Sequence, residues 1–185
     1  MSLRLDWCSH EAAKYAVEHW HYSKCLPAGK MARVGVWRDG QYIGCVLFSR
    51  GAASNIAKPY GLDQTKVIEL TRVALTHHKS QVSQIVSIAI RLLKKQSPGV
   101  RLIVSYADID QGHYGGIYQA GGWIYTGIAD IGDTSGFIVK GRRIHRRSIG
   151  AMGGTQSIAW VRANLDASAH AIIASGKHKY LYPLD

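Results

Sequence analysis

Apolar and polar residues alternate with two different periods along this chain, and the period indicates which element each stretch forms. Residues 9–20 carry apolar side chains at helical spacing behind Ser9, a residue type that caps helices. Residues 33–37 and 41–49 alternate strictly instead, on either side of Asp39-Gly40, a dipeptide typical of tight hairpin turns. The pattern therefore predicts a helix followed by an antiparallel hairpin.

The middle of the chain is predicted to form a strand, a helix and a second strand. Residues 66–75 predict the first strand, and residues 80–96 predict a helix with a broad apolar face that ends before a Pro-Gly pair. Residues 100–108 form a continuous apolar run, typical of a strand that is buried on both faces. A glycine-rich segment and a further strand over residues 123–128 follow, which completes a β-α-β unit.

The last third of the chain combines alternating and helical patterns. Residues 136–147 alternate as strands do, and residues 157–174 predict a last helix. No internal repeat or long linker divides the sequence, so residues 1–185 are expected to form one domain. The predicted fold class is α/β, with a mixed sheet flanked by helices and an additional helix near the C-terminus.

The charge of the chain narrows the range of its partners. There are 23 Lys and Arg residues against 12 Asp and Glu residues, and the net charge of +11 favours polyanions, namely DNA, RNA or an anionic membrane surface. No apolar run reaches the length of about 18 residues that spans a bilayer, and the first residues lack a secretory signal. Cys8, Cys25 and Cys45 form an odd set, typical of reduced thiols. We therefore expect a cytoplasmic protein that binds nucleic acid and does not enter a membrane.

A basic segment over residues 140–147 is a candidate for phosphate contacts. Its pattern is strand-like, and its Lys and Arg residues are Lys140, Arg142, Arg143, Arg146 and Arg147. Such side chains hold a duplex in register without reading its sequence, so binding should be salt-sensitive with a modest base preference. The alternative is a solvated surface strand without a partner.

The segment around Asp108 is the best candidate for chemistry. Asp108 ends a buried strand, at the edge of the sheet where open α/β sheets place their ligands. Gly112, Gly115 and Gly116 allow the backbone to approach a ligand or a neighbouring strand, and Tyr118 offers a proton and a stacking surface. The alternative is that Asp108 only caps a short helix and that Tyr118 packs as a half-buried aromatic.

The order of the predicted elements resembles the acyltransferase fold of the GNAT superfamily. In that fold two central strands splay apart, and the phosphates of the acyl donor bind at the N-terminus of the following helix. The corresponding corner spans residues 74–84, and its candidate donor-binding residues are Thr76, His77, His78, Lys79 and Ser80, with Thr76 and Ser80 as candidate caps. This corner has no glycine, unlike the coenzyme A loop of the superfamily. Charge and hydroxyl contacts can still hold a phosphate there; the alternative is a plain solvated helix start.

A longer stretch, SYADIDQGHYGGIYQAGGWIYTG at residues 105–127, resembles the signature of the Mom family. Three further pieces resemble the same family in the same order: HYSKCLPAGK at residues 21–30, IELTRVAL at residues 68–75 and KHKYLYPL at residues 177–184. Members of this family are phage DNA-modifying proteins of GNAT-like fold that convert adenine to its carbamoylmethyl derivative. The resemblance therefore implies a bacteriophage enzyme with anti-restriction activity that works on DNA in the cytoplasm of the bacterial host.

The resemblance also implies which residues act. By position in the matching motifs, the catalytic candidates are His21, Tyr22, Ser105, Asp108 and Tyr118. Members of the family have been proposed to bind iron, and the resemblance makes His21, Tyr22 and Asp108 the candidate ligands, side chains that suit a hard metal. The Cys and His residues between positions 8 and 25 lack the paired spacing of a zinc finger.

The product of the family suggests a route to it. A glycyl group on the exocyclic amine of adenine is an isomer of the carbamoylmethyl product, so acylation followed by rearrangement leads to the product. This favours a glycyl donor such as charged tRNA over acetyl-CoA, with Asp108 orienting or deprotonating the amine and Tyr118 stabilising or protonating the leaving group. The target base must be flipped out or single-stranded, and Trp20, Tyr22, Tyr118 and Trp123 are the candidates to stack on it.

Two other classes of function stay open on the sequence alone. They are a CoA-dependent N-acetyltransferase and a non-catalytic nucleic-acid-binding protein. The glycine-free donor corner argues against the first class, and the concentration of His, Tyr and Gly residues after Asp108 argues against the second. The sequence indicates neither the oligomeric state nor the target sequence.

Overall fold

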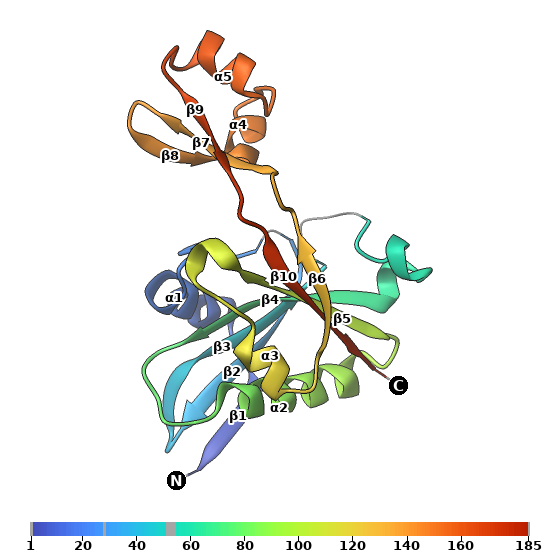
Figure 1. Cartoon of the computed structure of the whole chain (residues 1–185). Coiled ribbons are helices and arrows are strands. Elements are labelled where there is room, and N and C mark those ends of the chain that lie inside the picture. Colours follow the sequence, from blue (N-terminus) through green and yellow to red (C-terminus); the bar gives the residue numbers. More distant parts are fainter. Residues whose placement is uncertain (1, 28, 51–54, 185) are drawn as a thin grey trace. The chain divides into compact units, whose positions relative to one another are not determined.

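The computed structural model describes residues 2–27, 29–50 and 55–184, which are coloured along the chain in Figure 1. They form two compact units. The first unit contains Met1–Tyr106, Gly115–Thr126 and Lys179–Asp185, and the second contains Ala107–Tyr114 and Gly127–His178. The organisation of the whole chain as one domain stays a prediction.

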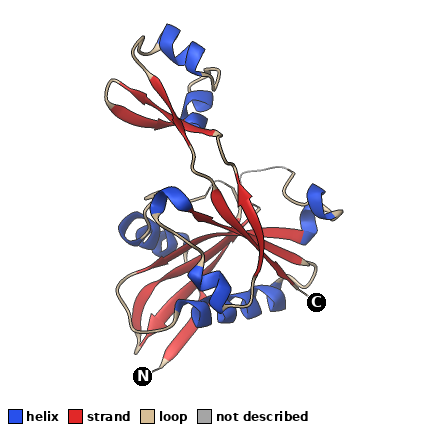
Figure 2. Ribbon diagram, viewed as in Figure 1, coloured by secondary structure: helices blue, strands red, loops and turns tan. Residues whose placement is uncertain are grey.

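The first unit is built around a mixed sheet with the strand order β1-β2-β3-β4-β5-β10-β6 (Figure 2). Its strands are β1 (Leu3–Trp7), β2 (Met31–Arg38), β3 (Gln41–Ser49), β4 (Val67–Leu75), β5 (Leu102–Asp108), β6 (Ile124–Ala129) and β10 (Lys177–Pro183). The last residues of β5 and β6 and the first residues of β10 belong to the second unit. Antiparallel pairs join β1 through β4, whereas β4 and β5 run parallel. The strands predicted in the middle of the chain are confirmed with boundary shifts of one or two residues, while β1 and β10 were not predicted.

The hairpin of β2 and β3 forms for a local reason. Asp39 and Gly40 have φ angles of 49° and 81°. A type I′ turn needs positive φ at both central positions, and Asp and Gly tolerate this conformation better than other residues. The predicted hairpin is therefore confirmed, including its turn.

Two longer helices cover the sheet of the first unit. Helix α1 (His10–Trp20) begins where the Ser9 hydroxyl accepts a hydrogen bond of 3.1 Å from the Ala12 amide, as predicted. Its small residues, Ala13 and Ala16, pack in a buried cluster with side chains of β3 and β4. Helix α2 (Val82–Gln96) buries the broad apolar face that its sequence predicts, but it begins two residues later than expected. Across the described ranges, no helix is both long and apolar enough to cross a membrane.

Short helices complete the first unit. They are η1 (Lys58–Tyr60), η2 (Gln64–Lys66) and α3 (Gly116–Ala120). Helix α3 lies in the glycine-rich segment that was singled out for chemistry, and it contacts α2. The three cysteines are free thiols, as expected.

The second unit has a sheet and a core of its own. Its elements are η3 (Ile109–Gln111), β7 (Thr134–Val139), β8 (Arg142–His145), α4 (Arg146–Ala151), α5 (Ile158–Asn164) and β9 (His170–Ile173). The three strands pair in the order β8-β7-β9, all antiparallel. Phe137, Ile149 and Val161 form the centre of its hydrophobic core. In sequence, most of this unit is inserted between β6 and β10, which are neighbours in the larger sheet.

Two predictions for this region are wrong. The strand pattern expected as far as Arg147 ends at His145, because Arg146 and Arg147 begin α4. The helix expected over residues 157–174 ends at Asn164, and its second half forms a turn and the strand β9. The Asp166 carboxylate accepts hydrogen bonds from the amide and the hydroxyl of Ser168, which stops the helix. The following His-Ala-Ile-Ile run then pairs with β7. A short apolar run of this kind fits a strand or a helix, and tertiary pairing decides between them.

Candidate active site

The parallel strands β4 and β5 part in the middle of the first unit. Their pairing runs from Val67 opposite Leu102 to Leu70 opposite Ser105. Strand β4 nevertheless continues along β3 as far as Leu75. The predicted splayed sheet is confirmed, and Ser105 stands at the last residue pair before the splay.

A chain of hydrogen bonds crosses the start of the splay. The fully buried Ser105 hydroxyl lies 2.8 Å from the Leu70 carbonyl oxygen and 2.8 Å from the Tyr118 hydroxyl oxygen. A carbonyl only accepts, so the single proton of Ser105 is donated to Leu70. Tyr118 in turn donates its proton to Ser105. The phenol is thereby held in one orientation at the point where the two strands diverge.

Tyr118 is held in its neutral form. Burial is the largest cause that raises the pKa of its hydroxyl; the hydrogen bond with Ser105 lowers this pKa, the negative charge of Glu69 raises it, and the net result is a pKa of about 12. A phenol with this pKa stays protonated at neutral pH. Tyr118 can therefore give a proton or a hydrogen bond to a reacting oxygen, but it is a poor base.

Aromatic side chains fix the position of Tyr118. The ring centroids of Tyr180 and Trp123 each lie 5.0 Å from that of Tyr118. Gly115, with φ of 76°, lets Tyr180 approach, since a Cβ at this position would lie 2.2 Å from the Tyr180 hydroxyl oxygen. The side-chain amide of Gln119 donates to that same oxygen at 3.1 Å. The glycine thus serves the approach of a neighbouring strand, one of the two uses that its sequence suggested.

His21 and Tyr22 follow directly on α1, and their rings lie 4.3 Å apart. His21 is only 8% exposed, whereas Tyr22 is 47% exposed. Tyr22 is close enough to Tyr118 for ionisation of the Tyr22 phenol to raise the pKa of Tyr118. Of the four aromatic residues considered for stacking, Tyr118 and Trp123 are buried and Trp20 packs against the core, so Tyr22 is the accessible one.

The hydrogen bonds of His21 decide which nitrogen carries its proton. The Ser23 amide donates to Nδ1 of His21 at 3.1 Å, and the Ser23 hydroxyl lies 2.8 Å from the same nitrogen. A backbone amide only donates, so Nδ1 is unprotonated and the proton of the neutral ring is on Nε2. His21 therefore offers an N–H donor from Nε2.

This tautomer does not fit the iron site that the family resemblance suggests. A histidine that binds a metal uses an unprotonated nitrogen and donates its other N–H to an acceptor. In His21 the unprotonated Nδ1 is already engaged by the Ser23 amide. Within the described part of the chain, moreover, no three His, Cys, Asp or Glu side chains are grouped so that they could hold a metal ion. We therefore assign no step to a metal.

Asp108 lies in the second unit and not in the unit that contains Ser105 and Tyr118. It is the N-cap of η3, and its carboxylate accepts a hydrogen bond of 3.1 Å from the Asp110 amide. The capping role considered for this residue is therefore present. Its catalytic role stays a prediction, as do those of His21, Tyr22, Ser105 and Tyr118.

Two charged residues of β4 belong to this region and were not singled out from the sequence. Glu69 raises the pKa of Tyr118 through its negative charge. Arg72 donates from Nε to the Cys25 carbonyl at 3.4 Å and from a terminal nitrogen to Thr71 at 2.7 Å. The sequence gives one signal for them, because two charged residues stand within a mainly apolar strand. A buried strand carries charged residues only when these have partners.

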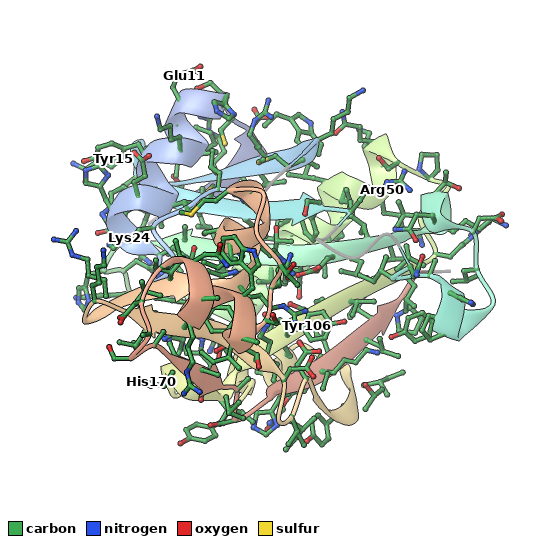
Figure 3. The ribbon with its side chains drawn as sticks, turned by 90° about the horizontal axis from the view of Figure 1, so that it is seen from above. Glu11, Tyr15, Lys24, Arg50, Tyr106 and His170 are labelled. Atoms are coloured by element: carbon green, nitrogen blue, oxygen red, sulfur yellow. The ribbon has the colours of Figure 1, made fainter. Side chains whose placement is uncertain are left out.

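Arg72 thereby ties β4 to the loop that follows α1. The same loop is held from its other side, where Lys24 donates from Nζ to the His19 carbonyl at 2.8 Å. Figure 3 labels Lys24 beside Tyr15, whose ring stacks on His19 at 4.0 Å. These contacts order the backbone that presents His21 and Tyr22.

The predicted donor corner is cationic but lacks the caps that the sequence suggested. The N-cap of α2 is Gln81, which makes no side-chain capping bond, so neither Thr76 nor Ser80 caps this helix. Instead the Ser80 hydroxyl accepts a hydrogen bond of 2.5 Å from Arg38, and the Ser80 amide donates to Nδ1 of His78. Burial lowers the pKa of His78, and the charges of Arg38 and His77 lower it further. Arg38, which the sequence did not single out, thus joins the corner.

The splayed parallel pair, the helix after β4 and the strand order define the class of protein: it has the acyltransferase fold of the GNAT superfamily. An IAA acetyltransferase from Bacillus cereus ATCC 14579 is similar with a TM-score of 0.55 and 13% identity, covering 99% of this chain and 100% of that one. An acetyltransferase of Bacillus subtilis in complex with CoA has a TM-score of 0.52 and 13% identity, with 100% of both chains covered. An aminoglycoside acetyltransferase in complex with coenzyme A and kanamycin has a TM-score of 0.51 and 14% identity, covering 70% and 88%. At such identities the likeness shows the fold alone.

A narrower assignment comes from the sequence family. The model of the Mom protein family matches residues 2–185, so this chain belongs to the Mom family. The resemblance found in its motifs is confirmed. Among curated proteins, no sequence matches this chain.

Proposed function

We propose that this protein is a DNA-modifying transferase that converts adenine to its N-carbamoylmethyl form by glycyl transfer and rearrangement. The observation that carries the proposal is the neutral, oriented Tyr118 hydroxyl on Ser105, at the start of the splay of a GNAT-like sheet. Membership of the Mom family supports DNA as the acceptor. The proposed product implies an anti-restriction role for a phage that carries the protein.

The proposed reaction balances without an oxidant or a reductant. The exocyclic amine of adenine attacks the ester carbonyl of glycyl-tRNA, an amide bond forms, and the ribose hydroxyl leaves with one proton. The free amine of the attached glycyl group then attacks C6 of the purine, and the original bond from C6 to nitrogen breaks. The original nitrogen ends as the carboxamide of the product, which is an isomer of the glycyl intermediate.

Each residue of the first unit has a proposed role in the transfer step. Tyr118 gives a proton to the leaving ribose oxygen, and its raised pKa keeps that proton available at neutral pH. The Nε2–H of His21 donates to the oxyanion that develops on the carbonyl. Tyr22, the accessible aromatic, stacks on the unpaired adenine. Ser105 does not contact substrate in this scheme and keeps Tyr118 oriented.

Asp108 has the proposed role of orienting or deprotonating the attacking amine. Replacing Asp108 with Asn retains an oxygen that can accept the Asp110 amide and cap η3. Modification should then be lost while DNA affinity stays nearly unchanged. Equal loss of modification and affinity would make Asp108 a structural residue.

The donor corner supports a donor that is rich in phosphates. It lacks the glycine loop that binds coenzyme A in the superfamily, so the donor is proposed to be something other than such a cofactor. Arg38 and Lys79 bring positive charge to the uncapped start of α2, where amide groups favour anions, and His77 and His78 lie beside them. The net charge of +11 also suits a tRNA donor together with a DNA acceptor.

Transfer from isotopically labelled glycyl-tRNA to adenine-containing DNA tests the proposal. The expected result is label in a nucleoside heavier than deoxyadenosine by one glycyl unit, detected by mass spectrometry. Uncharged tRNA with free labelled glycine is the control and should give no product. If DNA from cells that express the protein is modified but glycyl-tRNA gives no transfer in vitro, the proposal that glycyl-tRNA is the donor is rejected. The proposal that adenine in DNA is the acceptor is then retained.

A CoA-dependent N-acetyltransferase is the second candidate, and the cationic corner at the start of α2 is the observation that favours it. Acetyl-CoA should raise the melting temperature if the corner binds it, because a ligand that binds only the folded state stabilises that state. Stabilisation by acetyl-CoA together with acetylated product would replace the glycyl proposal. DNA binding with no modified base would leave a non-catalytic binding protein.

A further inference from the structure

The tip of the β7–β8 hairpin, in the second unit, carries three cationic residues within four positions. Val139 pairs with Arg142, so the hairpin closes through the two residues Lys140 and Gly141. Both have positive φ angles, 49° and 73°, which gives a tight type I′ turn. Lys140, Arg142 and Arg143 are all exposed. Strands β7, β8 and β9 contain no Asp or Glu residue that would oppose these charges.

The charges are arranged around the ribbon and not on one side of it. Successive side chains of a strand point to opposite faces, so Arg142 and Arg143 place one guanidinium on each face. Lys140 adds a third charge at the end of the turn. Strand β9 begins at His170, which pairs with Ile138, so the turn lies beyond the last pair of the third strand. A ribbon that is cationic on both faces suits a groove with phosphates on both sides better than a flat surface.

A carboxylate holds this tip in place. Asp166, in the turn between α5 and β9, accepts a hydrogen bond of 2.6 Å from the Lys140 amide. Its other oxygen accepts from the amide and the hydroxyl of Ser168, at 2.9 and 2.6 Å. Asp166 is therefore committed to bracing the turn, which reduces the conformational entropy that the tip would lose on binding.

We infer that the tip of the β7–β8 hairpin, Lys140 to Arg143 braced by Asp166, enters the major groove of duplex DNA and contacts phosphates on both of its sides. The major groove of B-form DNA is about 12 Å wide and admits a two-stranded ribbon, and it exposes the exocyclic amine of adenine. The major groove of A-form RNA is deep and narrow, so the tip discriminates duplex DNA from the helices of tRNA. The inference rests on the proposed function for its choice of DNA as partner.

The salt dependence of binding to a mixed-sequence duplex tests the phosphate contacts. Each phosphate contact contributes about 0.9 to the slope of log affinity against log salt concentration. The double variant Arg142→Gln, Arg143→Gln should lose about two such contributions. Its matched control, Lys94→Gln with Lys95→Gln, removes two exposed charges from α2 and should keep the slope. Equal losses in both double variants would overturn the inference, since they would reflect net charge alone.

Asp166→Ala separates the brace from simple electrostatics. This variant makes the protein more positive, so charge alone predicts tighter binding to DNA. A braced tip predicts weaker binding, because the Lys140 amide loses its acceptor and the turn loosens. Thermal unfolding of the variant checks that the core around Phe137 and Val161 is intact. Tighter binding by a folded Asp166→Ala protein would contradict the inference.

Chemical protection locates the groove. Guanine N7 faces the major groove, so the bound protein should protect it from methylation by dimethyl sulfate, and the Arg142→Gln, Arg143→Gln variant should protect it less. Displacement by the minor-groove ligand netropsin without N7 protection would place the tip in the other groove and refute the inference. Binding of tRNA with the same slope and the same loss in the variant would refute the preference for DNA. Nucleoside mass spectrometry is carried out in parallel. If the protein protects guanine N7 but no modified adenine is found, the proposed reaction is rejected and the inferred contact with the major groove is retained.

Discussion

Tyr118 and Ser105 share a hydrogen bond of 2.8 Å at the last residue pair that β4 and β5 have in common. This position links the fold to its proposed chemistry, because Ser105 completes the pairing of β4 and β5 through the Leu70 carbonyl and fixes the Tyr118 phenol with its remaining lone pairs. The start of the splay and the orientation of the proposed acid are therefore set by the same side chain. A change at Tyr118 should affect chemistry and leave the protein folded, whereas a change at Ser105 should affect both rate and stability.

Tyr118→Phe should abolish most of the transfer and leave the protein folded. The variant keeps the ring that packs on Trp123 and Tyr180 but removes the proton of the general acid, a change worth about 10²- to 10⁴-fold in rate. Single-turnover transfer of labelled glycyl groups to DNA measures the rate. Tyr60→Phe is the control, since the Tyr60 hydroxyl finds no hydrogen-bond partner among the described residues and its loss should not slow transfer.

The buried Tyr118 phenol should also change how the free energy of unfolding depends on pH in the alkaline range. The folded pKa of Tyr118 is raised from 10.0 to about 12, so its contribution to stability is complete below pH 10 and is lost as the pH rises through 12. Denaturant unfolding measured across this range should fall less steeply for Tyr118→Phe than for the unaltered protein. Parallel curves would mean that the phenol is not buried in solution.

Ser105→Ala should lower both the rate of transfer and the free energy of unfolding. The loss of rate should be smaller than that caused by Tyr118→Phe. The buried Leu70 carbonyl loses its side-chain partner at a cost of about 1–3 kcal/mol, and the Tyr118 hydroxyl loses its fixed orientation. Ser87→Ala is a matched control, because the Ser87 hydroxyl donates to the Ser83 carbonyl at 2.9 Å on α2. A rate loss as large as that of Tyr118→Phe, without loss of stability, would give Ser105 a direct part in the chemistry.

The sequence predicts those features of the fold that depend on neighbouring residues. The β2–β3 turn follows from Asp39-Gly40, and the start of α1 follows from Ser9, because each is decided within a few residues. The resemblance of the element order to the GNAT superfamily implied a splayed sheet, and the resemblance to the Mom family implied Ser105 as a residue of the splayed strand; the structure places Ser105 at the start of the splay. These predictions are confirmed because local preference and tertiary structure agree there.

The features that the sequence did not predict depend on distant partners. Arg38 reaches Ser80, and Arg72 reaches Cys25, across long stretches of chain, and no local pattern shows such pairs. Strand β9 forms only because β7 lies beside it. The assignment of Asp108 to the second unit likewise follows from the contacts of residues 107–114 and not from the strand that precedes them.

Gly115→Ala should destabilise the protein more than Gly112→Ala. Both glycines have positive φ, at 76° and 69°, so each alanine costs about 1–2 kcal/mol of backbone strain. At Gly115 the added Cβ also meets the Tyr180 ring, whereas at Gly112 no atom lies within 4 Å. Urea unfolding compares the two variants. Equal destabilisation would show that Tyr180 moves aside without cost, and combining Gly115→Ala with Tyr180→Leu should recover part of the loss.

A phosphate at the donor corner should raise the pKa of His78. Burial together with the charges of Arg38 and His77 holds this pKa below the ordinary value of 6.5, and an anion would offset the repulsion by the two cations. Titration of the histidine signals by NMR, without and with uncharged tRNA, measures the shift. Arg38→Gln should raise the pKa of His78 in the free protein and weaken the response to tRNA. If the pKa of His78 is the same without and with tRNA, this corner does not bind the donor.

Duplex DNA should raise the pKa of His145, as a phosphate should raise that of His78. Burial lowers the pKa of His145, and the charges of Arg147, Lys177, Arg146 and Arg143 lower it further. Its Nδ1 accepts the Arg147 amide at 3.1 Å, so the neutral ring caps α4 and protonation breaks that cap.

Because the folded pKa is depressed, the stability that His145 contributes is complete above its ordinary value of 6.5 and is lost as the pH falls through the lowered value. Phosphates around the β7–β8 hairpin would neutralise the neighbouring cations and raise the pKa, so DNA affinity should increase on mild acidification. His145→Gln keeps a hydrogen-bond acceptor for the cap and should remove this pH dependence at constant salt. An NMR titration of His145 that gives the same pKa with and without duplex DNA would place the phosphates away from this strand.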